Sequence, residues 1–111
     1  MAEVFKFINA TLATSAIASQ NIYTSPANTT SIVFMGQVAN KEGSNSASFS
    51  VTATDSSGSS TKFLASLIPV PANSATTFLT GKLVLEAGDY ISANANTAAA
   101  VDISLSVLQL T

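Results

Sequence analysis

Residues 47–54, Ala-Ser-Phe-Ser-Val-Thr-Ala-Thr, alternate strictly between apolar and polar side chains. Residues 101–107, Val-Asp-Ile-Ser-Leu-Ser-Val, repeat this alternation near the end of the chain. Successive side chains of an extended strand point to opposite faces, whereas in a helix these apolar residues would spread around every side. Both segments are therefore predicted to be β-strands with one buried face.

Six further segments are expected to be strands, because they are rich in β-branched and aromatic residues. They are residues 4–12, 17–23, 31–39, 62–68, 76–85 and 90–95. Residues 40–45, 55–58 and 86–89 combine Gly with Asn or Asp, which is typical of turns. About eight short strands joined in this way predict an all-β fold, an antiparallel two-sheet β-sandwich of jelly-roll or immunoglobulin-like type. The 111 residues are expected to form one such domain.

The composition argues against several classes of function. The chain has no Cys and no His, and therefore lacks thiol chemistry, the commonest metal ligand and the commonest general base. Only 9% of the residues are charged, the net charge is −2 and all four basic residues are Lys, which argues against nucleic-acid binding. No apolar stretch is long enough for a membrane span, and the first residues do not resemble a signal peptide. We expect synthesis in the cytoplasm of the host cell and no membrane partner.

The polar residues do not form a recognisable catalytic pattern. A Ser or Thr nucleophile would have no His as its base, and the chain has neither a Gly-x-Ser-x-Gly elbow nor a phosphate-binding Gly-rich loop. Most of the six carboxylates lie in expected turns, and Asp55 and Asp89 each offer only one ligand to a cation. The sequence therefore predicts a protein that is not an enzyme, with no catalytic residue, metal, cofactor or small-molecule substrate.

Six Phe residues are distributed over the expected strands, and we predict one or two core aromatics in each. The first expected strand is unusual, because Val4, Phe5, Phe7 and Ile8 make it apolar on both faces. Such a strand is either central in its sheet or covered by another subunit. These four residues are the candidate assembly interface.

Assembly is also expected from the surface as a whole. A β-sandwich has edge strands, which free-standing proteins usually protect with charges, and this chain has few charges. Its polar surface must consist mainly of Ser and Thr, which is uncommon for a freely diffusing domain. We expect a closed homo-oligomer, with a homotrimer as the favoured form.

Four segments together resemble the small β-sandwich virion structural proteins of tailed bacteriophages. They are YTSPANTT at residues 23–30, VFMGQVAN at 33–40, LVLEAGDYISA at 83–93 and VDISLSV at 101–107. The likeness covers most of the chain. It carries over no functional residue, because the function of such proteins is the assembly itself.

The resemblance implies a capsid-surface cement or decoration protein that stabilises the shell by contacts with itself and with a major capsid protein, and that is located in the virion. A neck, tail or baseplate component is the alternative within this class. A carbohydrate- or receptor-binding module is the alternative from another class, because β-sandwiches commonly carry lectin sites in their end loops.

Overall fold

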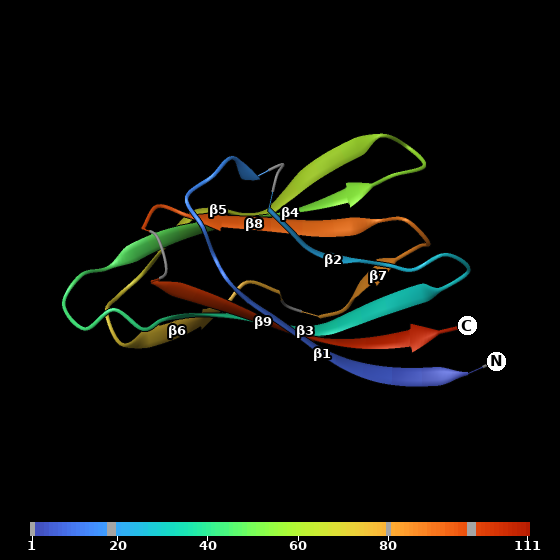
Figure 1. Cartoon of the computed structure of the whole chain (residues 1–111), viewed down its shortest axis with the longest axis horizontal. Helices are drawn as coiled ribbons and strands as arrows, with labels where there is room; N and C mark the ends of the chain where they lie inside the picture. The colour runs from blue at the N-terminus through green and yellow to red at the C-terminus, as the bar shows by residue number, and fades with distance from the viewer. Residues whose placement is uncertain (1, 18–19, 80, 98–99) are drawn as a thin grey trace.

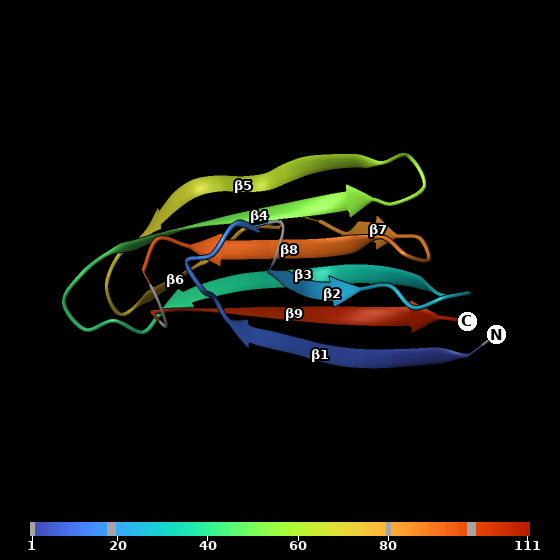
Figure 2. The ribbon, with the colours of Figure 1, turned by 45° about the horizontal axis from the view of Figure 1, so that its top comes forward.

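The computed structural model describes residues 2–17, 20–79, 81–97 and 100–111, and these form nine β-strands and no α-helix. The strands are β1 (Glu3–Thr11), β2 (Asn21–Thr24), β3 (Thr30–Asn40), β4 (Ala47–Asp55), β5 (Ser60–Val70), β6 (Ser74–Thr77), β7 (Leu83–Leu85), β8 (Tyr90–Ala95) and β9 (Val101–Leu110). They build two antiparallel sheets, as Figures 1 and 2 show. The predicted all-β sandwich is confirmed.

The strand order is that of a jelly roll. One sheet has the order β1-β9-β3-β6, with β7 also paired to β3, and the other has the order β2-β8-β4-β5. Strands β1 and β9, β2 and β8, β3 and β6 or β7, and β4 and β5 are antiparallel partners. The chain is thus one long ribbon that turns back at the β4–β5 hairpin and is rolled into two sheets.

The core lies between the two sheets and follows the alternation seen in the sequence. Phe49 and Val51 of β4 are buried, as are Ile103, Leu105 and Val107 of β9. The side chains between them point to the outer faces, where Asp102, Ser104 and Ser106 of β9 are half-buried but Ser50, Thr52 and Thr54 of β4 are buried as well. The alternation therefore identifies the core-facing side of both strands, as predicted, but the prediction of a single buried face is wrong for β4, which is buried on both faces.

Two predicted strands are shorter than expected. The segment 17–23 is extended only from Asn21, and its residues 18–19 lie outside the described part of the chain. The segment 76–85 forms two short strands, β6 and β7, instead of one. Between them the chain leaves the sheet at Phe78, whose ring covers Gly36, and it turns at Gly81, whose φ of 87° lies in the left-handed region that favours Gly.

The two ends of the described chain lie side by side. Ala2 N–H donates to Thr111 O at 3.1 Å, and Thr111 N–H donates to Ala2 O at 3.0 Å. Figure 2 shows both ends at one end of the elongated molecule, with the loop of residues 41–46, drawn in green, at the other. The long axis of the molecule measures 47 Å.

Candidate functional site: an exposed apolar face

The most prominent surface feature is a row of apolar side chains on the outer face of the five-stranded sheet. Val84 of β7 is paired with Ile32 of β3, Ile32 with Leu108 of β9, and Leu108 with Phe5 of β1. The neighbouring row, Val33 and Val107, is fully buried against the other sheet. Because successive residues point to opposite faces, the first row points away from the core.

Three more apolar residues extend this row toward the middle of the sheet. The β3–β9 register shifts between Val33 and Met35, and Phe34 occupies this irregularity as an extra residue. The Phe34 ring meets the Phe5 ring edge to face, with centroids 6.1 Å apart. Phe7 and Met35 are both paired with Ser106 and therefore share one face. We call the set Phe5, Phe7, Ile32, Phe34, Met35, Val84 and Leu108 the outer apolar face.

The outer apolar face covers only one half of its sheet. It lies at the end where the chain begins and ends, because it takes the first residues of β1 and β3 and the last residues of β9 (Figure 2). The other half carries mainly polar residues at the outward positions, namely Asn9, Thr11, Gln37, Asp102 and Ser104, with Ala39 among them. The sheet surface is therefore divided into an apolar half and a polar half.

The structure divides the four residues of the predicted assembly interface between two faces. Phe5 and Phe7 belong to the outer apolar face, and both are exposed. Val4 and Ile8 point to the opposite side of β1, where Ile8 packs against the core and Val4 is partly exposed. β1 is an edge strand, so the first explanation for its two apolar faces, a central position in the sheet, is wrong, and cover by another subunit stays a prediction.

The prediction of core aromatics in each strand is wrong for most of the Phe residues. Phe49 is buried and Phe78 packs against it, but Phe5, Phe7, Phe34 and Phe63 are exposed. Strand bulges explain part of the error. Phe34 is the extra residue of β3, and register shifts in β5 place Phe63 opposite the outward-facing Thr52.

A second feature is a cluster of three carboxylates where the β4–β5 turn meets the β7–β8 turn. Oxygens of Asp55, Glu86 and Asp89 all lie within 4.8 Å of one another. Asp89 is buried, and its carboxylate accepts hydrogen bonds from Ser56 N–H at 3.0 Å and Glu86 N–H at 2.9 Å. Sequence reasoning treated Asp55 and Asp89 as separate turn residues, whereas the fold joins them. The backbone contacts make Asp89 a clamp between the two turns.

Two carboxyl groups, those of Asp55 and Asp102, lie in surroundings that favour the charged form. Hydrogen bonds from the Ser57 hydroxyl and Gly58 N–H lower the pKa of Asp55. A hydrogen bond from the Thr11 hydroxyl, together with the Lys41 ammonium 3.1 Å away, lowers the pKa of Asp102. A general acid at neutral pH needs a raised pKa, and neither carboxyl group has one.

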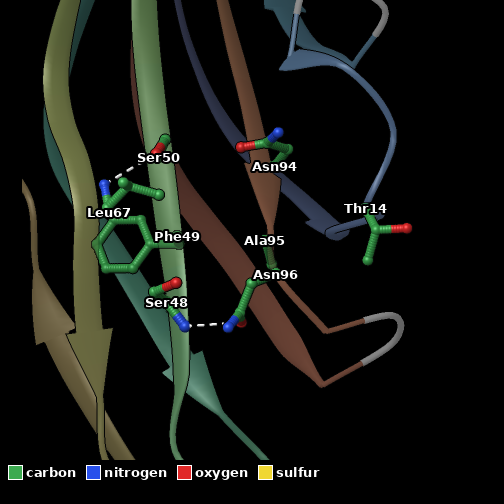
Figure 3. Close-up of a pocket in the computed structure, with 8 residues that line it drawn as sticks. All are labelled: Thr14, Ser48, Phe49, Ser50, Leu67, Asn94, Ala95 and Asn96. Carbon is green, nitrogen blue, oxygen red and sulfur yellow. Dashed lines mark hydrogen bonds between the residues drawn. The ribbon is translucent and has the colours of Figure 1, made fainter.

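A shallow groove crosses the outer face of the four-stranded sheet (Figure 3). It encloses about 200 Å³ and is lined by Thr14, Ser48, Phe49, Ser50, Leu67, Asn94, Ala95 and Asn96. Two hydrogen bonds hold its walls: Leu67 N–H donates to Ser50 Oγ, and Ser48 N–H donates to Asn96 Oδ1, both at 2.9 Å. The lining offers hydroxyl and amide groups but no ionisable side chain.

Comparison with protein-family models, with curated proteins and with solved structures found no match to this chain. The described residues contain no helix that is long and apolar enough to cross a membrane.

Proposed function

We infer that this chain is a non-enzymatic structural protein of a virus particle and that it acts through protein–protein contacts. The observation that carries this proposal is the outer apolar face, which spans four strands and exposes three Phe side chains. Contiguous apolar patches on soluble domains commonly mark interaction sites. The absence of His and Cys from the chain supports binding over catalysis.

Within this class we propose a decoration protein that cements the capsid of a tailed bacteriophage, with copies of itself and a major capsid protein as partners. The jelly roll supports the proposal by analogy, because this architecture is frequent in viral capsid proteins. A fold by itself does not determine a function, so the outer apolar face remains the main support. The same features would serve a neck, tail or baseplate component.

Cryo-electron microscopy of the virus particle that contains the chain tests this proposal. A decoration protein is expected at repeated positions over the head shell, and a neck, tail or baseplate component at one end of the particle. A particle with no density for the chain at either location would contradict the structural role.

The groove of Figure 3 supports a second candidate, a carbohydrate-binding module. The hydroxyl groups of Thr14 and Ser48 line the groove beside the amide of Asn94, and these are groups that hydrogen-bond to sugars. The exposed ring of Phe63 lies on the same face and lines an adjoining hollow together with Leu67. A glycan array on which the purified chain binds no sugar would reject this candidate.

A further inference from the structure

We propose that the outer apolar face is buried against the same face of a second copy of this chain, in a dimer with two-fold symmetry. The proposal rests on the structural role inferred above and names one partner for its main surface. Face-to-face packing of this kind would place two five-stranded sheets against each other, about 10 Å apart, as two sheets pack within a sandwich.

The exposed apolar area matches the requirement of one such contact. The exposed fractions are 70% for Phe5, 65% for Phe7, 42% for Phe34 and 58% for Val84. At 150–250 Å² for each aromatic side chain, the three Phe residues alone expose about 250–450 Å². A standard interface buries about 800 Å² on each partner, and about 65% of a homodimer interface is apolar, which is ~500 Å². With Val84 and the partly exposed Ile32, Met35 and Leu108, the outer apolar face reaches this range.

The same comparison favours a dimer over the homotrimer expected from the sequence. Around a three-fold axis each outer apolar face would be divided between two neighbours, so each contact would bury about half of it. A two-fold contact is isologous and uses the whole face on both partners. The outer apolar face is therefore large enough for one stable contact but not for two.

The chemistry of the face also suits a second copy. None of its seven residues carries a charge, so a contact confined to the outer apolar face buries no like charges; the carboxylate of Glu3 points to the same side but lies at the end of β1, outside the face. A partner with a charged surface would lose solvation at this face and gain no ion pair. The nearest ion pair of the sheet, Lys41 with Asp102, lies in the polar half.

Pairing through the free edge of β1 is the competing way to join two copies. Lys6, in the middle of this strand, is paired with the buried Val107 and therefore points to the inner side of the sheet. A charged residue directed inward on an edge strand opposes the addition of another strand, because its charge would be buried. The outer face is open to contact while the edge is protected.

Sedimentation equilibrium of the purified chain at micromolar concentrations tests the proposal. The expected mass of the wild type is twice the 11.3 kDa of one chain. The double variant Phe5→Ser/Phe7→Ser is expected to sediment as a monomer, with a dimer dissociation constant raised about thirtyfold or more. Phe63→Ser is the matched control: it removes an exposed Phe from the other sheet and should leave the dimer unchanged.

Val84→Lys is a second variant that keeps the test decisive if the double variant does not fold. It places a positive charge at an exposed position of both faces and should also produce a monomer. A monomeric or trimeric wild type would overturn the proposed dimer, as would variants that remain dimeric. A monomer found on virus particles would overturn the dimer alone, whereas a dimer absent from every particle would overturn only the proposed function.

Discussion

Asp89 connects two turns that are far apart in the sequence. Its side chain is 6% exposed, and its two oxygens accept N–H groups from Ser56 in the β4–β5 turn and Glu86 in the β7–β8 turn. Hydrogen bonds to a charged acceptor are stronger than neutral ones, and unpaired buried donors are costly. The hydrogen bonds from the two backbone N–H groups therefore offset the repulsion between the Asp89 carboxylate and the nearby carboxylates of Asp55 and Glu86.

We expect Asp89→Ala to lower the free energy of unfolding by about 2–4 kcal/mol, because two backbone N–H groups would lose their acceptor. Glu86→Ala is the matched control, since it also removes one carboxylate of the cluster but comes from an exposed side chain, and it should change stability by about 0.5 kcal/mol or less. Urea unfolding monitored by circular dichroism measures both. Equal losses in the two variants would show that Asp89 is not a clamp.

Asp102 gives the stability a dependence on pH. The Thr11 hydroxyl and the Lys41 ammonium hold its pKa below the ordinary value of 3.8. Because the folded pKa is the lower one, the stabilisation is complete above the unfolded-state pKa and is lost as the pH falls through the folded value. Both side chains of the ion pair are about half exposed, so solvent weakens the effect.

Asp102→Asn should therefore be less stable than the wild type at pH 7, by about 0.5–1 kcal/mol. The difference should shrink as the pH falls below 3.8 and through the lowered pKa of Asp102, where the wild-type carboxyl becomes protonated. Thermal unfolding of both proteins over this pH range checks the sign. A difference that stays constant down to the acid end would assign the loss to packing and not to charge.

At the scale of the element, the irregularities of β3 and β5 determine which aromatic side chains are exposed. Alternation predicts β4 and residues 101–107 of β9, because the apolar residues there face the core, whereas Leu108 already lies on the outer face. It fails once a strand contains an extra residue, since every later side chain then changes face. Nothing in the local sequence marks Phe34 as the extra residue, because its position depends on the pairing of β3 with β9.

The bulge of β5 has an identifiable support. Leu67 has a φ of 49°, a left-handed conformation that is unusual for a bulky residue, and its N–H donates to Ser50 Oγ on β4. Ser50 is buried, so its hydroxyl cannot readily be replaced by bulk water. The Ser50 hydroxyl thus takes the place of the backbone carbonyl that would accept the hydrogen bond from Leu67 N–H in a regular strand.

Ser50→Ala is expected to destabilise the protein by about 1–2 kcal/mol, because Leu67 N–H would lose its acceptor. Ser48→Ala, two residues earlier on the same outward side of β4, should have an effect within about 0.5 kcal/mol, since only the backbone of Ser48 makes the hydrogen bond to Asn96. Hydrogen exchange at Leu67 N–H provides a local readout and should accelerate only in Ser50→Ala. Unchanged exchange there would mean that the bulge does not depend on this hydroxyl.

At the scale of the whole molecule, the sequence predicted the class of fold and the number of layers. It did not predict the order in which the strands pair within each sheet. The pairing of β1 with β9 joins opposite ends of the chain, and no local signal encodes such a partner. The outer apolar face could be predicted only in part for the same reason. Phe5 and Phe7 were recognisable in one strand, whereas Ile32, Val84 and Leu108 join them only through the register of the sheet.

The adjacency of Ala2 and Thr111 has a practical consequence for anyone who labels or displays this protein. An affinity tag or fluorescent protein attached to either terminus would emerge at the same pole, beside Phe5 and Leu108, and could block the contact it was meant to report. Insertions into the loop of residues 41–46 would project from the far pole (Figure 2). A label or peptide inserted there would leave the outer apolar face accessible.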